Sequence, residues 1–348
     1  MPETIKGNDP AAEPETLDTA PAPHAPGQAV PGTRGRRRAW RILFRSMAAL
    51  AAVAVVAGLG LYAVVNHLES NIRRIPVTLA AAPTDSKRLT VLITSTEVGP
   101  TTGRSGPAST ATGLIMLLHL NADGETGGVV SIPSSTVVPV PGHGMTAIQN
   151  ATLDGGASLL VQTVNQLTGV PINHFARVDF NQLVKLADTV GGVDVTIPTA
   201  FTAYGHTFTA GVNHLNGVTA IYYARDPAIS EQTRVLRQQN LLRAAINKVV
   251  HGRLLSNPLT TINILNALTS ALTVDSNFSN SELITLASSL KSVTSNRGTF
   301  VTAPTTVVGG KQVLNSALSH QLWSAVNNDS IAAFAKQHAS LVTPTTVP

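Results

Sequence analysis

Leu89-Thr90-Val91-Leu92-Ile93-Thr94 is the stretch of sequence that decides the fold. A short apolar run rich in β-branched residues predicts a buried strand. Residues 114–120 and 128–132 have the same character, and Pro133 ends the second of these runs. Three such strands, separated by a Gly-, Ser- and Thr-rich loop and then a turn, indicate a sheet at the start of a folded domain.

Helical periodicity appears beyond these strands. Residues 156–167 carry apolar side chains at helical spacing, and Gly169 follows as a C-terminal stop. Residues 181–190 repeat the pattern before Gly191-Gly192, and residues 193–197 then alternate as a strand should. Further helices are expected at 215–224, 231–250, 259–272, 282–293 and 316–326, with a β segment at 299–306 and a turn at Gly309-Gly310.

Interleaved strands and helices predict an α/β fold, a three-layer sandwich with a central mixed sheet. We expect one domain over residues 89–329, with residues 91–93, 115–118, 129–131 and 193–196 in its sheet. Residues 330–348 are expected to be the end of a helix and a tail, frayed after Thr343.

A membrane anchor is expected ahead of this domain. Six arginines between Arg34 and Arg45 run into twenty uncharged residues, 46–65. Twenty helical residues rise about 30 Å, the thickness of the hydrocarbon core. A cleaved signal peptide is the alternative, but its apolar region is shorter, about 7–15 residues, and lies nearer the N-terminus. The positive flank keeps the N-terminus in the cytoplasm, so the sequence predicts a single-pass protein of the cytoplasmic membrane with an extracytoplasmic C-terminal domain.

The other segments follow from composition. Residues 1–45 are rich in Pro and Ala and are expected to be a disordered cytoplasmic tail with a basic flank; residues 66–88 are a linker. The tail holds seven of the 24 basic and five of the 19 acidic residues, so the remainder is close to neutral. A nearly neutral exported domain has no general attraction for nucleic acid. The tail has too few apolar residues to fold into a DNA-binding domain. There is no cysteine, so the core must hold without disulfides.

The helix expected at 231–250 carries the most suggestive chemistry. Arg234 and Gln238 are one turn apart, Arg237 lies beside them, and Glu231 precedes Arg234 by one turn. Arg225 closes the preceding helix. Guanidiniums gathered by two consecutive helices could bind a diphosphate bidentately. The alternative is that Glu231 and Arg234 form an ordinary surface pair and that Arg237 is simply solvated.

Seven segments in a fixed order resemble the LytR-CpsA-Psr (LCP) family of bacterial envelope proteins. They include Val130-Ser-Ile-Pro133, Ile172-Asn-His-Phe-Ala-Arg-Val-Asp-Phe180, Tyr223-Ala-Arg225 and Arg234-Val-Leu-Arg-Gln-Gln239. The others are Gly155-Gly156 with the run 160–170, residues 186–195 and residues 210–217. The resemblance covers about residues 89–329. It implies an α/β enzyme that uses a divalent cation, such as Mg²⁺, to transfer a polyprenyl-diphosphate-linked glycan onto peptidoglycan. Arg225, Arg234, Arg237 and Gln238 would then bind phosphate.

The sequence departs from the family pattern where the chemistry is expected. Ala111-Thr112-Gly113 stands where the family has Arg-Ser-Asp, and Ser134-Ser135 stands for Arg-Asp. Thr94-Ser95-Thr96 replaces Gly-Ser-Asp, and Pro227 replaces a second arginine. Hydroxyls cannot hold a hard cation as carboxylates do. Glu231 is the remaining metal candidate, Glu97 or Arg104 could substitute, and the histidines show no ligand spacing.

Three hypotheses remain open. The first is a catalytically degenerate protein that binds a polyprenyl-phosphate glycolipid, peptidoglycan or an envelope-assembly partner. The second is an active glycopolymer–peptidoglycan phosphotransferase with a rearranged site. The third, a transcriptional regulator, conflicts with the anchor and the short tail.

Overall fold

The computed structural model describes residues 70–79, 88–96, 112–179, 185, 187–251, 258–294 and 298–347. The chain divides into two compact units, Met1–Leu59 and Gly60–Pro348, and all of these residues belong to the second. The expected tail 1–45, the anchor 46–65, the loop 97–111 and half of the helix expected at 181–190 lie outside the described residues. In the part of the chain that the structure describes, no helix is long and apolar enough to cross a bilayer.

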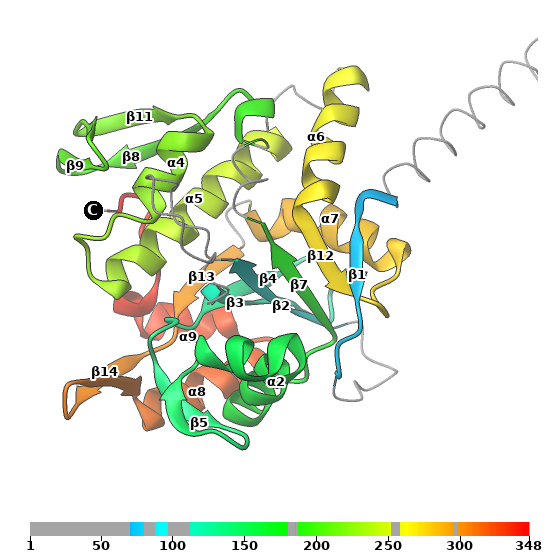
Figure 1. Cartoon of the computed structure of the whole chain (residues 1–348), viewed down its shortest axis with the longest axis vertical. Coiled ribbons are helices and arrows are strands. Elements are labelled where there is room, and N and C mark those ends of the chain that lie inside the picture. Colours follow the sequence, from blue (N-terminus) through cyan, green and yellow to red (C-terminus); the bar gives the residue numbers. More distant parts are fainter. Residues whose placement is uncertain are drawn as a thin grey trace, which may run out of the picture. The chain divides into compact units, whose positions relative to one another are not determined.

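A seven-stranded mixed sheet forms the centre of the second unit (Figure 1). Its order is β1 (Arg73–Ile75), β12 (Leu272–Asp275), β7 (His174–Val178), β2 (Leu89–Thr96), β3 (Thr112–Leu120), β4 (Gly127–Ser131) and β13 (Gly298–Thr302). β2 pairs with β7 in parallel and with β3 antiparallel. The three strands expected at the start of the domain are therefore confirmed and lie next to one another.

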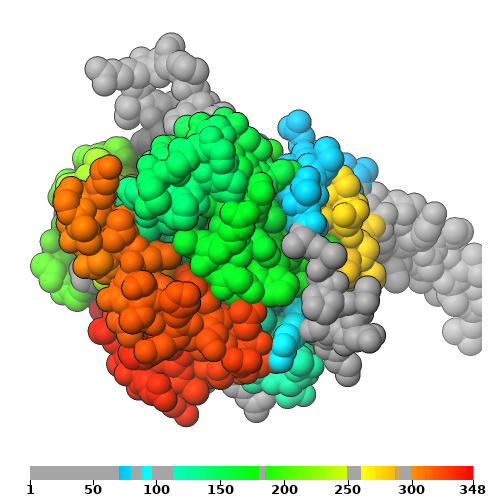
Figure 2. Space-filling view, turned by 90° about the horizontal axis from the view of Figure 1, so that it is seen from below, coloured from blue at the N-terminus to red at the C-terminus, as the bar shows by residue number. Residues whose placement is uncertain are grey.

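Both faces of this sheet are buried, because its strands are apolar on both sides. On one face Leu92, Leu117 and Val130 pack with α2 (Asn150–Thr168), α8 (Ser316–Asn327) and α9 (Ile331–Gln337). On the other, Val91 and Met116 pack with α5 (Glu231–His251) and α7 (Asn280–Thr294). The result is the expected sandwich of helices on both sides of a mixed sheet. Figure 2 shows α2 beside the C-terminal helices on one face of the molecule.

The strand at Val193–Ile197 does not join the central sheet, and that expectation was wrong. This strand, β8, pairs antiparallel with β11 (Gly211–Leu215) in a separate two-stranded sheet. Its burial alternates, with Val193, Val195 and Ile197 buried, so it has one wet face, whereas central strands need two dry ones. The following helix, α4 (Gly217–Ala224), begins two residues later than expected because Leu215 belongs to β11. The buried side of β8 packs in one hydrophobic cluster with α6 (Pro258–Ala271) and with the hairpin of β9 (Phe201–Ala203) and β10 (His206–Phe208).

Two further elements were not fully anticipated. The helix expected at 259–272 is α6, and β12 follows it without a break where no strand was expected. The β segment expected at 299–306 is divided into β13 and β14 (Thr305–Val308) around Ala303-Pro304, since proline cannot donate to a ladder. β14 belongs to a second sheet with β15 (Lys311–Leu314), β5 (Val137–Val140) and β6 (Gly144–Ala147). Gly309 and Gly310, both at positive φ, make the expected turn.

The C-terminal segment is held in place rather than frayed. After the short helix η2 (Ala339–Leu341), the Thr343 N–H donates to the Phe300 carbonyl at 2.9 Å. Arg243 of α5 donates to the carbonyls of Thr343 and Pro344, both at 3.0 Å, and the Val347 side chain is fully buried. The segment therefore covers the outer edge of β13, which would otherwise present unpaired backbone groups.

Candidate functional site

One edge of the central sheet collects the positions at which the family pattern predicts charged residues. β2, β4 and β13 run in the same direction, and β3 runs against them. The carboxyl ends of three strands therefore meet the start of β3 at one edge. The register places Thr96 opposite Thr112, and Ser131 between Met116 and Thr302. In α/β proteins ligands bind outside the carboxyl ends of the strands, so this edge is the candidate site.

Gln239 fixes α5 over this edge. Its Nε2 donates to the Ser131 hydroxyl at 2.5 Å and to the Val301 carbonyl at 3.1 Å, at the ends of β4 and β13. Its Oε1 accepts a hydrogen bond from the Thr343 hydroxyl. These bonds are buried, where hydrogen bonds are least replaceable by water. The first turn of α5 is thereby brought to the residues that follow β4.

A chain of polar contacts links Ser134 to Arg234. The Ser134 N–H and hydroxyl both donate to Glu231 Oε1, at 3.0 and 2.8 Å. The other oxygen, Glu231 Oε2, pairs with Arg234 NH1 at 3.0 Å. Side-chain exposure is 16% for Glu231 and 29% for Arg234, so this pair is not an ordinary surface pair. Ser134, which stands where the family has arginine, is thus bonded to the acid at the start of α5.

Three side chains at this edge carry buried polar atoms that have no hydrogen-bond partner among the described residues. They are Arg234 Nε, Ser95 Oγ and Thr302 Oγ1. A buried polar atom without a partner costs about 1–3 kcal/mol. Among the described residues, the hydrogen bonding of this edge is therefore incomplete at separate positions on β2, β13 and α5.

Arg237 lies elsewhere. Its guanidinium is 3.4 Å from Asp226 Oδ2, donates to the Tyr223 carbonyl at 3.2 Å, and lies 3.8 Å from the centre of the Phe201 ring. Its side chain is 3% exposed. Burial lowers the pKa of Arg237, although Tyr223 and Asp226 act against that shift. The residue joins α4, α5 and the β9–β10 hairpin from the inside.

Arg234 and Arg237, two of the four predicted phosphate-binding residues, therefore lie in different surroundings. Arg234 pairs with Glu231 at the start of α5, whereas Arg237 of the same helix pairs with Asp226, next to Arg225 at the end of α4. The Arg225 carbonyl accepts a hydrogen bond from the Tyr204 hydroxyl at 2.8 Å. Gln238 is one turn beyond Arg234 and is buried. Sequence reasoning missed Asp226, the partner of Arg237; the signal was an acid directly between Arg225 and Pro227.

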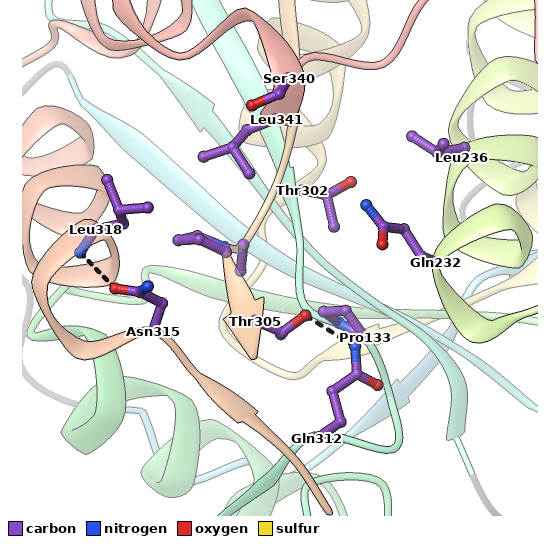
Figure 3. Close-up of a pocket in the computed structure, with 12 residues that line it drawn as sticks. Pro133, Gln232, Leu236, Thr302, Thr305, Gln312, Asn315, Leu318, Ser340 and Leu341 are labelled. Atoms are coloured by element: carbon purple, nitrogen blue, oxygen red, sulfur yellow. Dashed lines mark hydrogen bonds between the residues drawn. The ribbon is translucent and has the colours of Figure 1, made fainter. Parts of the chain in front are cut away.

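A cavity of about 140 Å³ lies beside the edge, between α5, the ends of β4 and β13, and the C-terminal helices (Figure 3). α5 contributes Gln232 and Leu236, which face Thr302 and Pro133 across the opening. The remaining lining is neutral: Ala303, Pro304, Thr305, Gln312, Asn315, Leu318, Ser340 and Leu341. Arg225, Arg234, Arg237 and Gln238 are not among the residues that line this cavity.

A divalent cation is the cofactor that the family resemblance implies, and the described residues do not fit it. Both oxygens of Glu231 already have partners, and Asp226 is paired with Arg237. Over the described ranges, no group of three or more His, Asp or Glu side chains could hold a metal ion. A hard cation needs several oxygen ligands, preferably carboxylates, at about 2.0–2.6 Å. This edge offers hydroxyls and amides instead.

Several known proteins are similar to this chain. The model of the LytR_cpsA_psr family matches residues 62–337. The probable cell wall biosynthesis protein LcpB of Corynebacterium glutamicum is 29% identical over 263 residues, which are 70% of this chain and 63% of that protein. The polyisoprenyl-teichoic acid–peptidoglycan teichoic acid transferase TagU of Bacillus mycoides is 34% identical over 163 residues, 45% of this chain and 51% of that protein. The chain thus spans less than two thirds of these relatives.

Solved structures agree on the fold. The LytR-Csp2A-Psr enzyme of Actinomyces oris superposes with a TM-score of 0.60 at 18% identity, covering 73% of this chain and 95% of that one. TagV of B. subtilis gives 0.58 at 22% identity, covering 71% and 98%. These superpositions support the α/β fold with its central mixed sheet. At such low identities they say nothing about the chemistry of the site. Together with the family match over most of its length, this shows that the chain belongs to the LytR_cpsA_psr family.

Proposed function

We propose that this protein is a membrane-anchored cell-envelope protein that binds a polyprenyl-(di)phosphate-linked glycan without transferring it. The observation that carries the proposal is the contact chain from Ser134 through Glu231 to Arg234 at the carboxyl edge of the sheet. It retains one partly exposed guanidinium for an anion. The metal ligands and the further arginines that phosphoryl transfer requires are missing from this contact chain.

The ligand class follows from the relatives. TagU is named for a polyisoprenyl-linked teichoic acid and for peptidoglycan, and one of the solved structures is TagT bound to LIIa-WTA. A polyprenyl phosphate headgroup is an anion that Arg234 can bind by a charge-assisted hydrogen bond. We propose that Arg225 and Gln238, which are close to Arg234 in the sequence, provide further polar groups for the phosphate. Peptidoglycan or an envelope-assembly partner is the second proposed partner.

Arg234 gives the most direct binding test. We expect Arg234→Ala to weaken binding of geranylgeranyl diphosphate by about 1.5–3 kcal/mol, the usual size of a hydrogen bond to a charged group. Glu231→Gln should tighten binding, because it removes the carboxylate that competes for Arg234. Isothermal titration of the full-length protein in detergent measures both changes. Lys311→Ala, an exposed cation on β15, is the matched control and should have no effect.

Equal binding by wild type and Arg234→Ala would refute the phosphate assignment. The catalytic half of the proposal needs a separate assay, in which full-length protein, lipid-linked donor and peptidoglycan are incubated with and without Mg²⁺. We expect no transfer and no dependence of lipid affinity on Mg²⁺. Mg²⁺-dependent transfer would instead establish the alternative, an active glycopolymer–peptidoglycan phosphotransferase that draws on residues such as Glu97 or Arg104.

The membrane topology is a proposal from the sequence. Residues 46–65 should cross the membrane once, with the arginine-rich flank inside. Reporter fusions made after Asn71 should be active only as extracytoplasmic reporters. An active cytoplasmic-type reporter at that position would contradict the topology and remove access to any envelope substrate.

A further inference from the structure

The turn of the β9–β10 hairpin holds a bulky residue in an unfavourable backbone conformation. Tyr204 has φ of 51° and is followed by Gly205 at 78°. Two successive positive φ values are typical of a tight hairpin turn, where Asn-Gly or Gly-Gly is preferred. A bulky aromatic residue there is an outlier, and such outliers persist at functional sites. Asn or Gly at position 204 would satisfy the turn with less strain, so the turn itself does not account for tyrosine.

The side chain of Tyr204 is held firmly. Its hydroxyl donates to the Arg225 carbonyl at 2.8 Å, and its ring centre lies 5.1 Å from that of Tyr222 on α4, with 30° between the planes. Even so, 37% of Tyr204 is exposed, and Tyr222 is half-buried. The two aromatic rings therefore stack with an offset at the end of α4, and Tyr204 is the more exposed of the two.

The structure beneath this surface is rigid. Phe201 and Phe208, at the bases of the hairpin, stack with centres 4.7 Å apart and planes at 18°. The Arg237 guanidinium lies 3.8 Å from the Phe201 ring and pairs with Asp226 in the α4–α5 turn. The hairpin, α4 and α5 are thus locked together. Fixed aromatic surfaces bind at low entropic cost, because few side-chain torsions are left to be ordered.

We propose that Tyr204, with Tyr222 stacked against it, forms a platform that binds a pyranose ring of a glycan. The C–H groups on one face of a sugar ring carry partial positive charge, and the faces of aromatic rings are negative. The platform adjoins Arg225, and the turn 226–230 connects it directly to Glu231 and Arg234. A sugar on the platform and a phosphate at Arg234 would thus lie at the two ends of one short segment. The identity of the glycan as an envelope polymer rests on the proposed function; the platform itself rests on the geometry of the two rings.

A neutral tetrasaccharide of β-1,4-linked N-acetylglucosamine is the probe, because it carries neither phosphate nor lipid. The full-length protein in detergent is titrated with it, and binding is followed by saturation-transfer NMR and by titration calorimetry. We expect Tyr204→Asn and Tyr222→Ala each to lower the affinity by about tenfold, the scale of losing a central aromatic contact. Tyr204→Phe keeps the ring and should stay close to wild type. Val212→Ala, at an exposed apolar position on β11 of the same region, should change nothing.

Thermal unfolding separates a binding role from a structural one. Tyr204→Asn suits the positive φ, so its melting temperature should equal or exceed that of wild type while sugar binding is lost. No binding of the tetrasaccharide to wild type, or equal binding by wild type and Tyr204→Asn, would overturn the platform. A lower melting temperature in Tyr204→Asn with unchanged affinity would assign tyrosine to the fold. If wild type binds the lipid diphosphate but not the tetrasaccharide, only the platform is refuted. If it binds the tetrasaccharide but not the lipid diphosphate, only the proposed phosphate site is refuted.

Discussion

Arg237→Ala should destabilise the folded domain by about 3–5 kcal/mol, the cost of leaving a buried charge without its partner. The Asp226 carboxylate is 6% exposed and would lose the guanidinium 3.4 Å away. The Tyr223 carbonyl and the Phe201 ring would lose contacts with the same group. For a domain of this size such a loss lowers the melting temperature by roughly 10 °C.

Thermal unfolding of the full chain can be followed by the fluorescence of Trp323, which is buried in α8. Arg234→Ala is the matched control: it removes an arginine from the same helix and should cost less than Arg237→Ala, because its partner Glu231 keeps two hydrogen bonds from Ser134. The double variant Arg237→Met/Asp226→Asn should be more stable than Arg237→Ala, because no unpaired charge remains. If both arginine variants melt alike, Arg237 is not the internal crosslink described above.

Asp275→Ala should cost a similar amount, about 3–4 kcal/mol, because one buried carboxylate serves three partners. Asp275 is fully buried; its Oδ2 lies 3.1 Å from His174 Nδ1 and accepts from the Phe175 N–H at 3.0 Å. Its Oδ1 accepts from the Asn277 N–H at 2.9 Å. Removal leaves two backbone donors unsatisfied and removes one of the two carboxylates beside the His174 ring, which stacks on Phe278 at 3.9 Å. Asp154→Ala, at a half-exposed position, is the control and should stay within about 0.5 kcal/mol.

The pH dependence of stability tests the same residue. Burial raises the pKa of Asp275, but the bonds from His174, Phe175 and Asn277 outweigh it, and the net pKa is lowered. A lowered pKa in the folded state gives stability that is present above the unfolded value of about 3.9 and is lost as pH falls through the folded value. Wild type should therefore lose stability below about pH 4, and Asp275→Asn should lose less over that range. Parallel acid limbs for the two proteins would contradict this assignment.

Local patterns in the sequence determined much of this molecule. The apolar runs at 89–94, 114–120 and 128–132 could only be satisfied by burial on both faces, which required a covered sheet. The long amphipathic pattern predicted α5, and the helix expected at 316–326 is α8, which agrees within a residue. The order of motifs identified the family, which the match over residues 62–337 confirms. Each of these inferences depends on neighbours in the chain, which the sequence supplies directly.

Partners distant in the chain were decided only by the tertiary structure. β8 alternates as any half-buried strand does, and its partner β11 had to be seen before it could be assigned to the small sheet. β12 follows α6 directly, and only its pairing with β7, about 100 residues earlier in the chain, identifies it as a strand. Arg234 and Arg237 are three residues apart on α5, so helical spacing alone places them on the same side of the helix. The structure gives them different neighbours, because α5 is packed on two sides. Because one side faces Ser134 and the other faces Asp226 and Phe201, one arginine reaches the candidate site and the other is buried in the core.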